Sequence, residues 1–224
     1  MPFQDSIINL KEIKNIIFDL DGTLIDSAPS ILEAFKQVLE QFSYAPIKPL
    51  NSGLIGPPLR ETLQVISGES DPEKLTLLVD AFKRSYDNDA YALSTSYIGI
   101  TEMLESLALT GKFLYLATNK RFIPTKKILQ FFEWEKYFQN VYAIDKVTPP
   151  YLHKAHMIES ILLDQGLQSK NCVYIGDRLE DGDAAKSNRL PFIYVSWGYG
   201  IEDDQIINHQ TAKNPNDLLT LLCN

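Results

Sequence analysis

The sequence predicts an α/β protein in which a parallel sheet, covered by helices on both faces, is interrupted by an inserted helical block. Apolar segments of strand length alternate with helical patterns through the second half of the chain, which is typical of βαβ units. A run without a convincing strand separates the first strand from the others. At 224 residues the chain is long enough for a core and a smaller inserted domain. We therefore expect a core domain of residues 1–26 and 95–224 and a helical domain of residues 27–94.

The composition is that of an ordinary globular protein, with 45% hydrophobic and 22% charged residues. The formal net charge of −8 argues against a nucleic-acid backbone as the main partner. No apolar run approaches the roughly 20 residues that cross a membrane, and Met1 to Lys14 do not resemble a secretion signal. We therefore expect a cytoplasmic protein with no nucleic-acid and no membrane partner. Cys172 lies in an apolar strand pattern and is expected to be a buried hydrophobic residue, not a nucleophile.

The first strand, Ile16 to Phe18, runs into Asp19-Leu20-Asp21-Gly22-Thr23. Because side chains alternate along a strand, Asp19 and Asp21 begin on the same side, where their charges repel each other. One interpretation makes them polar residues at a strand end, with Asp-Gly as an ordinary turn. The other makes Asp19 a nucleophile and Asp21 a proton-transfer group, with Mg²⁺ between them.

The following residues have helical periodicity up to about residue 94. The first helix places Ile31 to Phe42 on one face, a second opens at Pro57-Pro58, and a third follows Ser70-Asp71-Pro72. The two connections to the core, near Asp26 and near Ser94 to Gly99, are the candidate hinges.

The rest of the chain returns to alternating strands and helices. Strands are expected at 113–117, 141–144, 172–175 and 192–195, and helices at 99–109, 124–132 and 153–166. In an open parallel sheet the ligand crevice lies beyond the carboxyl ends of the strands. We therefore expect Asp19, Thr118 and Asp177, which each follow a strand, to meet there.

Further polar residues accompany these strand ends. Thr118 and the backbone N–H groups of Asn119 and Lys120 are suited to hold phosphate oxygens, although Thr118 is also an ordinary helix N-cap. Lys154 lies in a first helical turn, against the helix dipole, which is unusual for a purely structural lysine. Lys146 is the competing candidate for a functional lysine in this part of the chain. A separate acidic segment follows the strand at 172–175. There Asp177 and Asp181, four residues apart, would share one helix face and need a cation, whereas Asp183 is expected to be solvated.

These segments resemble the motifs of the haloacid dehalogenase-like (HAD) hydrolases, in their phosphoglycolate phosphatase-like form. The resemblance spans about residues 16 to 200 and is carried by Phe18 to Ser27, Leu116 to Lys120, His153-Lys154-Ala155, Gly176 to Asp181 and Trp197 to Gly200. The sequence departs from the family pattern at Ile98 and Ala155, where prolines are common, and at Gly182, where a branched apolar residue is usual.

The resemblance implies a Rossmann-like three-layer α/β/α core with a helical cap, and a Mg²⁺-dependent phosphatase that forms a phospho-aspartate. The implied catalytic residues are Asp19, Asp21, Thr118 and Lys154. The implied metal ligands are Asp19, the backbone carbonyl of Asp21, and Asp177, with Asp181 in the outer shell of the ion. The implied substrate contacts are Thr118, Asn119, Lys120 and Arg60, the last from the cap, where a guanidinium suits a carboxylate or a second phosphate.

Three other functions stay open. A sugar phosphomutase would use the same two aspartates, although Thr118-Asn119-Lys120 favours the hydrolases. A signalling receiver domain is shorter and lacks the helical insertion, and a non-catalytic phosphate-binding member would retain the fold. The expected partner is a small phosphorylated metabolite, whose identity the sequence leaves open, and the protein is a monomer or a homodimer.

Overall fold

The computed structural model describes residues 9–200 and 210–223. Within them one six-stranded sheet has the order β5-β4-β1-β6-β7-β8, and each neighbouring pair is parallel. The strands are β1 (Asn15–Phe18), β4 (Phe113–Thr118), β5 (Phe138–Ala143), β6 (Cys172–Gly176), β7 (Phe192–Val195) and β8 (Gln210–Ala212). The predicted α/β class with a parallel sheet is confirmed, and the central strand is β1.

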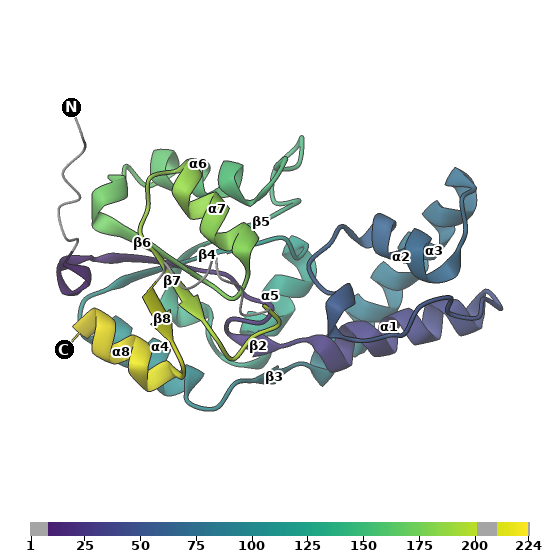
Figure 1. Ribbon diagram of the computed structural model, residues 1–224, viewed down its shortest axis with the longest axis horizontal. Coiled ribbons are helices and arrows are strands. Elements are labelled where there is room, and N and C mark those ends of the chain that lie inside the picture. The colour runs from purple at the N-terminus through teal and green to yellow at the C-terminus, as the bar shows by residue number, and fades with distance from the viewer. Residues whose placement is uncertain (1–8, 201–209, 224) are drawn as a thin grey trace.

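Helices cover both faces of the sheet (Figure 1). They are α4 (Ile100–Leu109), α5 (Phe122–Phe131), α6 (Lys154–Asp164), α7 (Leu179–Ser187) and α8 (Pro215–Cys223). Ile16 and Phe18 pack with α4, α5 and α8, whereas Ile17 packs with α6 on the opposite face. Because successive strand residues point to opposite faces, this apolar run supplies both halves of the core. In the described part of the chain, no helix is both long enough and apolar enough to pass through a bilayer.

Three helices form a separate unit beside one end of the sheet (Figure 1). The helical unit consists of α1 (Ala28–Gln41), α2 (Leu59–Ser67) and α3 (Pro72–Asn88). Asp71 caps α3 by accepting from the backbone N–H groups of Glu73 and Lys74, as expected for an Asp-Pro helix start. Phe35, Leu63 and Leu78 belong to an apolar cluster made only of residues from this part of the chain. The helical unit therefore has its own core, while its limits as a domain stay a prediction.

The two connections to the helical unit pair with each other. β2 (Ile25–Asp26) and β3 (Thr95–Ser96) form a two-stranded antiparallel sheet. The sequence pattern predicted no strand at either place, because two residues are too few to show an alternation of apolar and polar side chains. Backbone hydrogen bonds thus join the segments proposed as hinges.

Further short elements were not predicted either. β8 is a polar edge strand whose sequence, Gln-Thr-Ala, carries little strand signal. Helix α8, which the sequence analysis did not consider, buries Leu218 and Leu222 against the sheet. Short 3₁₀ helices occur at η1 (Leu10–Glu12), η2 (Ser52–Leu54), η3 (Ala90–Leu93), η4 (Glu135–Tyr137) and η5 (Ser169–Asn171).

The two cysteines are expected to differ in reactivity. Cys172 is fully buried in β6, and burial raises the pKa of its thiol to about 12, so the reactive thiolate is scarce near neutral pH. Cys223 is partly exposed. In native protein at pH 8, iodoacetamide should alkylate Cys223 and leave Cys172 unmodified, as checked by mass spectrometry of peptides. Denatured protein, in which both should react, is the control, and equal labelling of both in native protein would contradict the buried position.

Candidate functional site

The sheet order brings the predicted polar residues together. β1 lies between β4 and β6, with Phe18 opposite Leu116 on one side and Ile175 on the other. The residues that follow these strand ends therefore reach the same crevice, as open parallel sheets predict.

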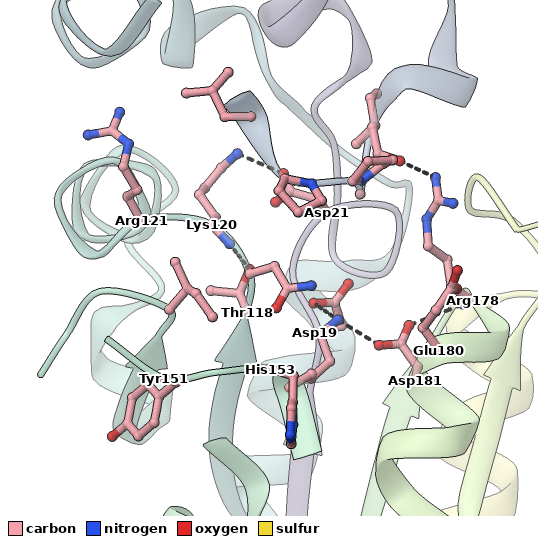
Figure 2. A pocket seen from close by; sticks show the side chains of 18 of the residues that line it. Asp19, Asp21, Thr118, Lys120, Arg121, Tyr151, His153, Arg178, Glu180 and Asp181 are labelled. Atoms are coloured by element: carbon pink, nitrogen blue, oxygen red, sulfur yellow. Dashed lines mark hydrogen bonds and ion pairs between the residues drawn. The ribbon is translucent and has the colours of Figure 1, made fainter. Parts of the chain in front are cut away.

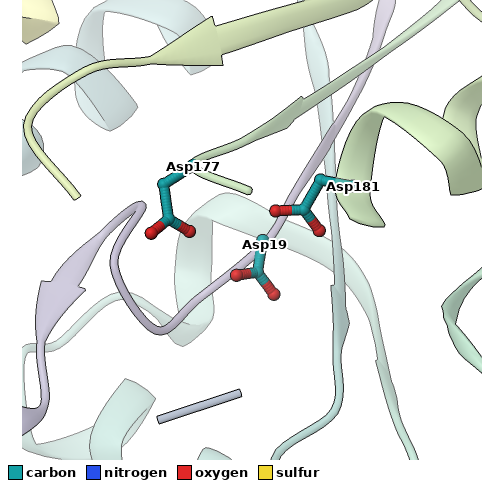
Figure 3. A group of neighbouring side chains, drawn as sticks. All are labelled: Asp19, Asp177 and Asp181. Carbon is teal, nitrogen blue, oxygen red and sulfur yellow. The ribbon is translucent and has the colours of Figure 1, made fainter. Parts of the chain in front are cut away.

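Three carboxylates gather at this edge (Figure 3). Asp19, Asp177 and Asp181 are buried, and one oxygen of each lies within 4.8 Å of those of the others. Burial raises the pKa of Asp19 to about 8 although the Lys154 ammonium opposes the shift. Burial and the charge of Asp181 raise the pKa of Asp177 to about 6. The cluster is therefore short of positive charge.

Lys154 is the cation that the chain itself supplies to this cluster. Its Nζ lies 2.8 Å from Oδ1 of Asp19 and 2.6 Å from Oδ1 of Asp181. One ammonium cannot balance three carboxylates, and oxygen ligands of this kind suit a divalent cation such as Mg²⁺. The residues present therefore fit a metal. The competing candidate Lys146 instead donates to Oδ1 of Asn140 at 2.6 Å.

Asp177 is positioned by residues from two loops. The backbone N–H of Tyr199 donates to its Oδ2 at 2.7 Å, and the Thr23 hydroxyl donates to Oδ1 at 3.4 Å. A Cβ at Gly22 would lie 2.2 Å from Oδ2 of Asp177, and one at Gly198 would lie 2.4 Å from its Cβ. Only glycine fits these approaches, which explains part of the Trp197 to Gly200 segment. The sequence pattern of that segment predicted no role for Tyr199.

Asp181 is fixed in the first turn of α7. Its Oδ2 accepts from the backbone N–H of the N-cap residue Arg178 at 3.1 Å, as the N3 residue does in one half of a capping box. Its Oδ1 accepts from the Tyr174 hydroxyl at 3.4 Å as well as from Lys154. The carboxylate thus has fixed partners on both oxygens.

Asp21 lies apart from the three carboxylates and has its own cation. Lys120 Nζ is 2.9 Å from Oδ1 of Asp21 (Figure 2). It also lies 4.7 Å from the ring centre of Tyr86 in the helical unit. The Lys120 backbone N–H donates to Oγ1 of Thr118 at 3.1 Å. Lys120 therefore contacts both the strand-end residues and the helical unit.

A cavity of about 1070 Å³ lies between the sheet edge and the helical unit (Figure 2). Asp19, Asp21, Thr118, Asn119, Lys120 and Lys154 all line it. The structure thus joins most of the predicted site residues in one space.

Arg60 is not brought to this cavity, contrary to the sequence-based expectation. Its guanidinium donates to Oγ1 of Thr76 at 3.1 Å and to the carbonyl of Pro72 at 2.8 Å, and the residue is absent from the described cavity lining. The arginine ties α2 to α3, because its position in the first turn of α2 faces the neighbouring helix.

Two other arginines, which the sequence analysis missed, line the cavity from the core. Arg178 Nη2 donates to the carbonyl of Ile55 at 2.6 Å, and Arg121 Nη1 donates to Oδ2 of Asp87 at 2.9 Å. Both reach across to the helical unit. No local pattern revealed them, since their partners are distant in sequence.

Removal of the Lys154 charge should destabilise the metal-free protein. Lys154→Met leaves the buried carboxylates without a counterion, and we expect a loss of about 3–5 kcal/mol in unfolding free energy. Urea unfolding in EDTA measures it, and Mg²⁺ should recover part of the loss because a divalent cation replaces the ammonium. Lys126→Met removes the half-exposed pair with Glu135 and should cost about 1 kcal/mol or less. Equal losses in the two variants would contradict the importance of the buried pair.

Comparisons with known proteins cover most of the chain. The family model described as haloacid dehalogenase-like hydrolase matches residues 16–195. A 5′-nucleotidase of Pseudomonas aeruginosa is 30% identical over 208 residues, which cover 92% of this chain and 93% of the relative. A phosphoglycolate phosphatase of Xylella fastidiosa (strain Temecula1) is 27% identical over 207 residues, which cover 88% and 86%.

Solved structures also resemble this chain. The crystal structure of a predicted phosphatase from Clostridium acetobutylicum has a TM-score of 0.80 at 28% identity, and the match covers 93% of this chain and 97% of that chain. The family resemblance predicted from the strand-end motifs is confirmed. The matched residues 16–195 include the helical unit and the carboxylate cluster, and the chain belongs to the haloacid dehalogenase-like hydrolases.

Proposed function

We propose that the protein is a Mg²⁺-dependent phosphatase that hydrolyses a small phosphate monoester through a phospho-aspartate. The observation that carries this proposal is the placement of Asp19. Its carboxylate lies in a cluster that fits a metal, contacts Lys154, and lines the same cavity as Asp21 and Thr118. Two successive phosphoryl transfers require a nucleophile, a proton-transfer group and side chains that bind the phosphate oxygens.

In the first step an Asp19 oxygen forms a bond to phosphorus while the bond to the leaving oxygen breaks. Asp21 gives that oxygen its proton, and the Lys120 ammonium, 2.9 Å from Oδ1 of Asp21, would stabilise the carboxylate that results. In the second step Asp21 takes a proton from water, the water oxygen bonds to phosphorus, and the Asp19 carboxylate departs. The products are the alcohol and inorganic phosphate, and both aspartates return to their starting states.

The phosphate oxygens would be held by Thr118 at the end of β4 and by Lys154 in the first turn of α6. Thr118 offers its hydroxyl, and Lys154 offers the ammonium that also contacts Asp19. Asp19, Asp177 and the Asp21 carbonyl would hold Mg²⁺, with Asp181 in its outer shell, and the ion would stabilise the charge of the transferring phosphoryl group.

We further propose that residues 27–94 form a cap over this site. The cation–π contact of Lys120 with Tyr86 and the bonds of Arg121 and Arg178 to the helical unit support this role. A cap that covers the cavity excludes water from the phospho-aspartate. The names of the relatives, a 5′-nucleotidase and a phosphoglycolate phosphatase, support a small phosphate monoester as substrate.

The test is phosphate release from p-nitrophenyl phosphate and other small phosphate esters with Mg²⁺. Asp19→Asn should lower kcat by about three orders of magnitude or more, because an amide is not a nucleophile toward phosphorus. EDTA should abolish release and Mg²⁺ should restore it. Asp80→Asn, on the exposed face of α3, is the matched control and should keep full activity.

The intermediate is tested separately. A ³²P-labelled ester should transfer label to the intact protein in a form that hydroxylamine removes, and Asp19→Asn should not be labelled. Full activity of Asp19→Asn, or of the intact protein in EDTA, would contradict the proposal. Conversion of glucose 1-phosphate to glucose 6-phosphate without phosphate release would indicate a mutase instead.

A further inference from the structure

The wall that the helical unit contributes to the cavity carries no charge. Its lining residues include Ile31, Leu54, Pro57, Leu59 and Tyr86, and each of the others from this unit is also uncharged. On the core side the rim adds Leu152, whose side chain is 82% exposed. The part of the cavity that faces a leaving group is therefore apolar.

The cations of the described cavity lining all come from the core, and each already has a partner. Lys154 contacts Asp19 and Asp181, and Lys120 contacts Asp21. Arg121 pairs with Asp87 of the helical unit through both terminal nitrogens. These partners leave none of the three free to receive a second anionic group of a substrate.

Arg178 is the remaining cation, and its surroundings also disfavour an anion. Its Nη2 donates to the carbonyl of Ile55 at 2.6 Å. Glu180 and Asp183, which lie in the helix α7 that Arg178 precedes, line the same cavity. A carboxylate on the leaving group would have to break an existing bond and would meet two like charges, which costs affinity.

The volume of the cavity also favours a leaving group larger than a two-carbon unit. A cavity of about 1070 Å³ is at the upper end of the range of small-molecule sites, which bury most of the surface of a ligand of drug size. A two-carbon leaving group such as glycolate would leave most of the apolar wall in contact with water. A ring-bearing alcohol would cover it.

We propose that the preferred substrates are phosphate monoesters of uncharged, ring-bearing alcohols, as in nucleoside monophosphates, and that esters of carboxylate-bearing alcohols are poor substrates. This inference rests on the proposed function and assigns the selectivity to the helical unit. The phosphate group is held by the core, so the neutral alcohol is what the apolar wall recognises.

The test compares kcat/KM for three esters with Mg²⁺. Uridine 5′-monophosphate presents a ring, glycerol 1-phosphate a small neutral alcohol, and 2-phosphoglycolate a carboxylate. We expect the nucleotide to exceed glycerol 1-phosphate by about tenfold and 2-phosphoglycolate by about a hundredfold. Equal or faster hydrolysis of 2-phosphoglycolate would overturn the inference.

A variant tests the wall directly. Leu54→Lys places an ammonium among the apolar residues and should shift the ratio of kcat/KM about tenfold toward 2-phosphoglycolate. Leu77→Lys, at an exposed position of α3 that is not part of the described lining, should leave the ratio unchanged, and thermal unfolding of both variants verifies folding. An unchanged ratio in folded Leu54→Lys would also overturn the inference.

The two proposals fail in different ways. If no ester is hydrolysed, p-nitrophenyl phosphate included, the phosphatase itself is contradicted. If p-nitrophenyl phosphate is hydrolysed through Asp19 but the three esters give equal kcat/KM, the phosphatase stands and only the selectivity is contradicted.

Discussion

The contact of Lys154 with Asp19 and Asp181 is the interaction on which the site depends. Three carboxylates buried within 4.8 Å of one another are unfavourable without positive charge, because burial and mutual repulsion both oppose ionisation. Lys154 supplies part of that charge from the first turn of α6, where the helix dipole does not favour a lysine. The carboxylate cluster therefore determines the position of this side chain, and a divalent cation would complete the balance.

The sheet order explains how the cluster forms. β1 is central, with β4 and β6 on either side, so three separate turns deliver their polar residues to one crevice. The helical unit enters the chain directly after β1 and returns before α4, and the β2–β3 pair holds both connections together. The Tyr199 hydroxyl accepts from the backbone N–H of Ser27 at 2.6 Å, while its backbone N–H holds Asp177. One residue thus links the carboxylate cluster to the start of the helical unit.

Local patterns predicted much of this arrangement from the sequence. The apolar strands, the Asp-Pro start of α3 and the strand-end aspartates all depend on neighbours in sequence, so the pattern reveals them. The position of Arg60 and the contacts of Arg178 and Tyr199 depend on which elements come together in the fold, and sequence spacing does not contain that information. Arg60 shows the difference clearly: its place in the chain matched a substrate-facing segment, but its guanidinium binds Thr76 and Pro72 on the neighbouring helix. The strands β2 and β8 were missed because they are short or polar.

The charged and the uncharged side chains around the cavity come from different parts of the chain. Every described charged side chain that lines the cavity belongs to the core, and the helical unit contributes uncharged residues. Asp19, Thr118 and Asp177 lie at strand ends whose geometry is set by the sheet, so substitutions in the cavity wall of the helical unit should leave these proposed site residues in place. Under the proposed function, the cavity wall that would meet the alcohol can therefore change without disturbing Asp19, Lys154 or Asp177.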